Sequence, residues 1–143
     1  MKKIICLLFV AVLAAGLFAG CGKDSGSTVY KDGTYTGKSG QDDTGAYGEA
    51  TVTIAGNKIT DCKYVTWQSD GIIKDEEYGK VNGEISNRDY YDKAQFAVKA
   101  MQQYARELVE VQMPDEVDAV SGATIAYGQF VEAVKNALKE AKK

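Results

Sequence analysis

The chain has 143 residues, of which 45% are hydrophobic and 26% are charged, with a formal net charge of −3 and no histidine. This balance is typical of one globular domain. An acidic chain without a run of basic residues is poorly suited to binding nucleic acid. The absence of histidine disfavours a zinc site and a histidine-dependent catalytic triad.

The first 20 residues have the features of an export signal. Lys2 and Lys3 precede an uncharged apolar run over residues 4–18, which is short for a membrane span. The Leu-Phe-Ala-Gly-Cys sequence that ends at Cys21 resembles the lipobox of bacterial lipoproteins, except that phenylalanine stands where leucine is usual. The resemblance implies removal of residues 1–20 and lipidation of Cys21, which would attach the protein to membrane lipid. A secreted protein cleaved near Ala19 and an uncleaved anchor helix are the alternatives.

The mature chain is predicted to be a short tether followed by one domain. Residues 21–28 contain the modified cysteine and a Gly/Ser-rich stretch, which predicts a flexible tether. Residues 29–143 show no further linker and no repeat. If Cys21 is modified and Cys6 is lost with the signal, as the resemblance implies, Cys62 has no cysteine with which to pair. We expect Cys62 to be an inert core residue.

The first half of this domain is predicted to form strands. Three segments have the composition or alternation of β-strands, over residues 29–38, 49–55 and 58–68. The Gly56-Asn57 turn joins the last two segments and predicts a β-hairpin. In residues 58–68 neither face is cleanly apolar. Residues 40–45 are predicted to be a polar loop.

A long polar loop is predicted over residues 69–88, and a loop of this length suggests a function or a ligand edge. It contains four acidic side chains that we expect to be a solvated surface rather than a metal site, Asp70, Asp75, Glu76 and Glu77. A helix is predicted from Asp89 to just before Pro114, because proline cannot continue a helix. Its apolar stripe consists of Ala94, Ala97, Val98, Met101, Tyr104, Ala105 and Leu108.

A second amphipathic helix is predicted over residues 123–141. Its apolar stripe consists of Phe130, Val131, Val134, Ala137, Leu138 and Ala141. Gly128 is unfavourable inside a helix and is expected to allow close approach of another segment or a ring. Strands followed by helices predict an α+β fold, with an antiparallel sheet and two helices packed on one face.

Residues 118–124, immediately before this second helix, are the most informative stretch of the chain. Two hydroxyl residues and a glycine lie at a helix start, where unpaired backbone N–H groups and the helix dipole favour an anion such as phosphate. The simpler interpretation is that Ser121 is the N-cap of the helix. Local sequence alone leaves both interpretations open.

The stretch Asp118-Ala119-Val120-Ser121-Gly122-Ala123-Thr124 resembles the Asp-x-x-Ser-Gly-Ala-Thr motif of the FMN-binding domain family. Residues 32–37 resemble the opening strand of that family, and residues 54–60 resemble its central hairpin. The resemblance therefore covers nearly the whole mature chain in the same order. Tyr127, preceded by alanine, departs from the Thr-Ser pair that many members have there.

The resemblance implies that Thr124 carries FMN through a phosphate ester made by a flavin transferase. Gly122 and Ala123 are small enough to admit the transferase and the phosphate. Ser121 would cap the helix and hold a phosphate oxygen. Asp118 would accept hydrogen bonds from loop N–H groups or be recognised by the transferase. Two aromatic residues are candidate contacts for the flavin ring, Trp67 and Tyr127.

By this resemblance the protein is expected to be a lipid-anchored flavoprotein on the extracytoplasmic face of the cell membrane. It would carry electrons rather than act as an enzyme, with membrane redox proteins or a quinol-linked dehydrogenase as partners. Two alternatives keep the fold: a lipoprotein that binds FMN noncovalently, and a surface interaction module without flavin. A third is a subunit of an ion-pumping membrane oxidoreductase.

Overall fold

A computed structural model describes residues 28–143 of the chain. The predicted export signal, Cys21 and nearly all of the predicted tether lie outside the described residues. The elements in chain order are β1 (Gly33–Gln41), β2 (Tyr47–Ala55), β3 (Lys58–Trp67), α1 (Arg88–Val111), the short helix η1 (Pro114–Glu116) and α2 (Thr124–Ala141). No helix within this described part is both long enough and apolar enough to cross a membrane.

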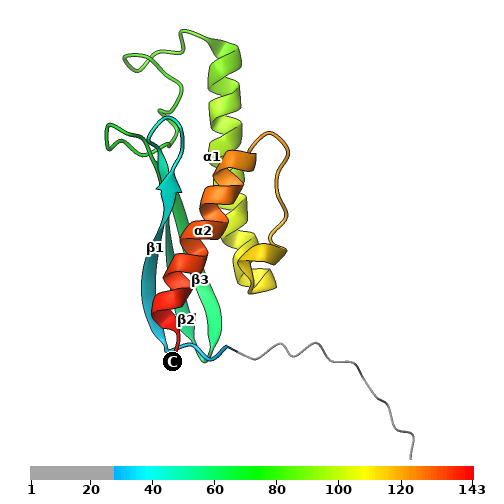
Figure 1. Ribbon diagram of the computed structural model, residues 1–143. Helices are drawn as coiled ribbons and strands as arrows, with labels where there is room; N and C mark the ends of the chain where they lie inside the picture. The colour runs from blue at the N-terminus through cyan, green and yellow to red at the C-terminus, as the bar shows by residue number, and fades with distance from the viewer. Residues whose placement is uncertain (1–27) are drawn as a thin grey trace, which may run out of the picture.

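The three strands form one antiparallel sheet in the order β1-β2-β3. Both long helices cover the same face of this sheet, with α2 against β1 and β2 and α1 against β3 (Figure 1). The opposite face carries polar side chains, including the hydroxyl pairs Thr34–Thr53 and Thr36–Thr51. The predicted α+β fold is therefore confirmed.

The predicted hairpin is present, with a β-bulge that its sequence pattern conceals. Gly56 and Asn57 both have left-handed backbone angles, with φ of 59° and 61°, as a tight hairpin turn requires. The pairing then shifts between Thr53–Asp61 and Ile54–Ile59, so the extra residue lies at Thr60. This shift changes which alternate side chains face the helices, and neither face of β3 is therefore apolar along its whole length.

The core lies between the sheet and the two helices. Every residue of the predicted α1 stripe is buried except Ala97, and every residue of the predicted α2 stripe is buried except Val131. Cys62 is buried in this core, and burial, followed by the negative charge of Asp61, raises the pKa of its thiol to about 12. The thiol is therefore protonated and inert at neutral pH.

The backbones of two segments approach closely at Gly37 in β1, not at Gly128. A Cβ atom at Gly37 would overlap the backbone of Ala133 and Ala137 in α2. No atom lies within 4 Å of a Cβ placed at Gly128, so the expected close approach at that position is wrong for the described chain. The contact between β1 and α2 therefore depends on a strand glycine, which leaves the helix free to pack directly on the backbone.

The element boundaries differ from the predicted ones by a few residues. β1 continues to Gln41, so the predicted polar loop shortens to the turn that ends at Ala46. Asn87 caps α1 by accepting a hydrogen bond from the Tyr90 N–H, at 3.0 Å. α1 ends before Pro114, as predicted, with Gln112 in a left-handed conformation.

Candidate functional site

The motif of residues 118–124 forms the connection into α2. Ser121 and Gly122 occupy a turn, in which Gly122 has φ of +89° and the Ala123 N–H donates to the Val120 carbonyl at 3.0 Å. The N-cap of α2 is Ala123, and no side chain caps the helix. The prediction that Ser121 is the cap is therefore wrong, because the left-handed turn at Gly122 delays the helix start by two residues.

The first turn of α2 exposes unpaired amides. The first N–H groups of any α-helix have no carbonyl one turn earlier to bind. In α2 the first helical hydrogen bond runs from the Tyr127 N–H to the Ala123 carbonyl, at 3.0 Å. Since no side chain among residues 28–143 replaces the missing partners, the amides of Thr124, Ile125 and Ala126 can bind an anion, which the helix dipole also favours. The Thr124 side chain is exposed at this point.

Two buried tyrosines bind the backbone on either side of Thr124, Tyr104 at the turn before it and Tyr64 in the helical turn after it. The Tyr104 hydroxyl donates to the Ala123 carbonyl at 3.3 Å and accepts the Val120 N–H at 3.1 Å. The Tyr64 hydroxyl donates to the Ala126 carbonyl at 3.2 Å. Burial raises the pKa of both hydroxyls, so both stay protonated and can donate at neutral pH.

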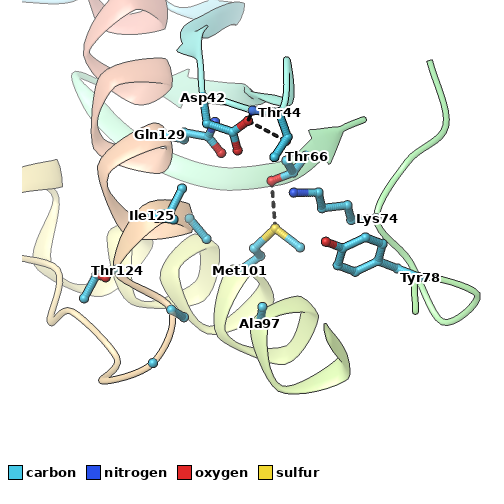
Figure 2. Close-up of a pocket in the computed structure, with 13 residues that line it drawn as sticks. Asp42, Thr44, Thr66, Lys74, Tyr78, Ala97, Met101, Thr124, Ile125 and Gln129 are labelled. Carbon is cyan, nitrogen blue, oxygen red and sulfur yellow. Dashed lines mark hydrogen bonds between the residues drawn. The ribbon is translucent and has the colours of Figure 1, made fainter. Parts of the chain in front are cut away.

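A pocket of about 350 Å³ opens beside this helix start, and we call it the Thr124 pocket. Residues 122–126 and Gln129 form one wall of it. The other walls come from the β1–β2 turn, the end of β3, the long loop and α1, through Asp42, Thr44, Thr66, Lys74, Tyr78, Ala97 and Met101. In Figure 2, Lys74 and Tyr78 lie across the pocket from Thr124, with Met101 between them. The volume is within the range of small-molecule sites.

The pocket combines one cation with mostly apolar walls. The Lys74 ammonium lies 5.1 Å from the centre of the Tyr78 ring, and burial followed by a hydrogen bond with Tyr90 raises the pKa of Tyr78 to about 12. Burial disfavours the charged carboxylate of Asp42, but hydrogen bonds from Thr44 and Ala46 and the charge of Lys74 outweigh burial and lower its pKa. The Asp42 carboxylate therefore accepts hydrogen bonds within its own turn, from Thr44 and Ala46. The positive group at the pocket is the Lys74 ammonium.

Four of the predicted site residues lie outside the Thr124 pocket. Ser121 is exposed in the turn before it, and Asp118 is exposed, with its backbone N–H bound to Glu107 at 2.9 Å. The Tyr127 ring packs against Tyr104, with 5.5 Å between ring centres. Trp67 lies at the end of β3, with an indole N–H that is buried and has no partner among residues 28–143. The structure therefore brings Gly122, Ala123 and Thr124 to the pocket, and the ring-contact role of the two aromatics stays a prediction.

Sequence reasoning missed the far side of the pocket. Lys74 and Tyr78 belong to the long loop, and Asp42 and Thr44 belong to a turn, so no periodic pattern marks them. The unusual length of the loop was the available signal.

The acidic side chains of that loop bind locally: Asp70 accepts the Ile72 N–H and Glu77 pairs with Lys80. Within residues 28–143 no group of three or more acidic or cysteine side chains could hold a metal ion.

Comparisons with known proteins identify a family and two similar structures. The sequence profile described as the FMN-binding domain matches residues 45–139. A crystal structure of a Clostridium perfringens protein is similar at 25% identity and a TM-score of 0.62, covering 79% of this chain and 89% of that one. A solution structure of a Clostridium thermocellum protein also matches at 25% identity, with a TM-score of 0.47, covering 79% of this chain and 93% of that one. No curated protein matches the chain.

Proposed function

Because the chain belongs to the FMN-binding domain family, we propose that it is an electron carrier with FMN attached covalently to Thr124. Family membership itself supports FMN as the cofactor. When bound, FMN supplies the redox chemistry, and the protein supplies attachment, position and a tuned environment.

The observation that carries this proposal is the position of Thr124. It is an exposed residue, it is the first residue of α2, and it is one of the residues that line the pocket of about 350 Å³. A phosphate ester on this hydroxyl would lie beside the unpaired amides of that turn. The helix dipole stabilises negative charge at the same place.

The walls of the Thr124 pocket fit a ligand with an anionic tail and a flat, largely apolar ring. Met101, Ala97 and Ile125 supply apolar surface, and Tyr78 supplies an aromatic ring. Lys74 is a flexible point charge that can approach an anionic group. Ile125 is 69% exposed, so a ring bound beside it would remain partly open to a partner protein.

We also propose that the domain is anchored by lipid at Cys21 on the extracytoplasmic face of the cell membrane. The lipobox resemblance supports this location. A covalent bond to FMN is useful at this location, because a freely dissociating cofactor would be lost outside the cell. The partners would be a flavin transferase and membrane redox proteins or a quinol-linked dehydrogenase. Labelling with palmitate tests the anchor: Cys21→Ala should lose the label, and equal labelling of both proteins would contradict it.

The attachment is tested by intact mass after co-expression with an active flavin transferase. We expect a gain of about 438 Da, the mass of FMN less water, which is lost when a hydroxyl becomes a phosphate ester. Thr124→Ala should abolish the gain and Thr124→Ser should keep it, because serine retains the hydroxyl. Thr44→Ala is the matched control, since Thr44 lines the same pocket and should not accept the cofactor. A full mass gain in Thr124→Ala would refute the attachment site.

Noncovalent binding of FMN is the second candidate, and the pocket itself favours it over a module without flavin. The two modes separate on denaturation, because a noncovalent flavin leaves the protein and an esterified flavin does not. If the mass of this protein stays unmodified while the same transferase modifies another substrate, the result would support the noncovalent mode. Titration with free FMN, followed by flavin fluorescence, would then measure the affinity of the pocket.

A further inference from the structure

Tyr104 connects both ends of the turn that precedes Thr124. Its side chain is fully buried, with 0% exposed, yet its hydroxyl makes two hydrogen bonds to the backbone. It accepts the Val120 N–H at 3.1 Å and donates to the Ala123 carbonyl at 3.3 Å. A phenolic hydroxyl can donate and accept at once, so one atom fixes the spacing of these two peptide groups.

The turn is also closed by one backbone hydrogen bond, from the Ala123 N–H to the Val120 carbonyl at 3.0 Å, and Tyr104 restrains the two peptide groups from the other side. The turn contains Gly122 in a left-handed conformation, and α2 begins without a side-chain cap. The Ala123 carbonyl receives both the Tyr104 hydroxyl and the first helical N–H, from Tyr127. The orientation of that peptide group determines how the chain enters Thr124. Tyr104 therefore supplies from the core the restraint that a capping side chain gives other helices.

Packing alone explains the Tyr104 ring but not its hydroxyl. The ring lies 5.5 Å from the Tyr127 ring and 5.6 Å from the Phe130 ring, measured between centres. Phenylalanine would make the same contacts. It would leave the Val120 N–H without its partner, however, and a backbone donor that loses its partner in a protein interior is costly.

We propose that Tyr104 is a positioning residue for attachment of the cofactor, and this rests on the proposed function of Thr124. The transferred group would come from a flavin dinucleotide bound by the transferase. A bond forms between the Thr124 oxygen and the phosphorus of the FMN moiety, the pyrophosphate bond breaks, and a nucleoside monophosphate leaves. The hydroxyl proton is released to solvent. Tyr104 holds the turn so that the transferase meets the Thr124 hydroxyl in one orientation.

The test compares Tyr104→Phe with Tyr64→Phe as the matched control. Tyr64 is also buried in this core and also donates to a backbone carbonyl of α2, that of Ala126, but it does not contact the turn. With an active transferase, we expect kcat/KM for mass gain to fall about tenfold in Tyr104→Phe, as for the loss of one well-placed hydrogen bond. We expect less than a twofold change in Tyr64→Phe, although both variants lose similar stability.

A second measurement does not depend on the flavin. In the unmodified protein, hydrogen exchange followed by NMR should be faster at the Val120 and Ala123 amides of Tyr104→Phe and unchanged there in Tyr64→Phe. Equal rate losses in the two variants would overturn the positioning role, as would wild-type exchange in Tyr104→Phe. Faster exchange with an unchanged rate of mass gain would overturn it too. A wild type that gains no mass would instead overturn the proposed function, and the exchange data would still decide whether Tyr104 holds the turn.

Discussion

Gly122 has a backbone conformation that other residues adopt with difficulty. Its φ of +89° is strained for a residue with a Cβ atom, while the nearest side chain, Phe96, would lie 3.4 Å from that atom and could accommodate it. We therefore expect Gly122→Ala to lower the free energy of unfolding by about 1 kcal/mol or more, through strain rather than a clash. Urea unfolding measures this change. Gly122→Asn should lose less, because asparagine tolerates the left-handed region.

Gly128 is the opposite case. It lies inside α2, and apart from the adjoining backbone of the helix itself no atom of the described residues lies within 4 Å of a Cβ at that position. Gly128→Ala is expected to raise the free energy of unfolding by about 0.5–1 kcal/mol, because alanine is the better helix former. The two glycine variants can be compared in the same urea series. A destabilised Gly128→Ala would contradict the open surroundings described for this residue.

Individual residues of the motif were only partly predictable from the sequence. Thr124, Gly122 and Ala123 could be placed at a helix start, because small and hydroxyl residues precede an apolar period. Ser121 was assigned the cap because serine is a favoured N-cap residue, but the left-handed glycine moved the helix start to Ala123. The role of Tyr104 was hidden, because a tyrosine in an apolar stripe looks the same whether its hydroxyl binds backbone or water.

The contact between β1 and α2 is set by a single strand glycine. Because a Cβ at Gly37 would overlap the α2 backbone at Ala133 and Ala137, the variant Gly37→Ala must push strand and helix apart. Overpacking of this kind costs about 1–3 kcal/mol, and backbone atoms yield less than side chains. Thermal unfolding should show a clearly lower midpoint. Gly40→Ala is the matched control on the same strand, since only the flexible carboxylate of Glu132 lies near it, and a similar loss there would contradict this account.

The strands and helices themselves were predictable where a period or a turn marked them. The hairpin at Gly56 followed from turn chemistry, and both helices followed from apolar stripes. The side chains of β3 that face the helices could not be predicted, because the bulge at Thr60 breaks the two-residue alternation on which such a prediction depends. Lys74 and Tyr78 could not be assigned to the Thr124 pocket, because a loop has no period and its path depends on tertiary contacts.

The length of α2 sets the distance between Thr124 and the start of the described chain, which matters for the proposed function. Its first residue is Thr124, and the carbonyl of its last residue, Ala141, accepts the Lys31 N–H at 2.8 Å. An α-helix rises 1.5 Å per residue, so the 18 residues of α2 separate these points by about 27 Å. The start of the described chain and the Thr124 pocket therefore lie at opposite ends of the domain (Figure 1).

This separation has a consequence if the chain is anchored at Cys21 as proposed. The eight residues predicted to form the anchor and tether reach about 15 Å as a flexible coil, which is less than the length of α2. The Tyr30 N–H binds the Asn57 side chain at 2.7 Å, so the β2–β3 turn lies at the anchored end. We therefore expect the β2–β3 turn to stay closer to the bilayer than Thr124 does, and the redox partner to approach the pocket from the aqueous side.

Energy transfer to the bilayer tests this arrangement. A donor dye would be attached at Lys58→Cys, beside the β2–β3 turn, or at Ile125→Cys, beside Thr124, in a Cys62→Ala background with acceptor dyes on the lipid headgroups. Transfer should be stronger from residue 58 than from residue 125, because it falls steeply over a difference of about 27 Å, the length of the helix between them. Cys21→Ala protein added to the same vesicles supplies the unanchored background. Equal transfer from the two positions would mean that the domain lies flat on the bilayer, and a membrane-embedded partner could then reach the pocket directly.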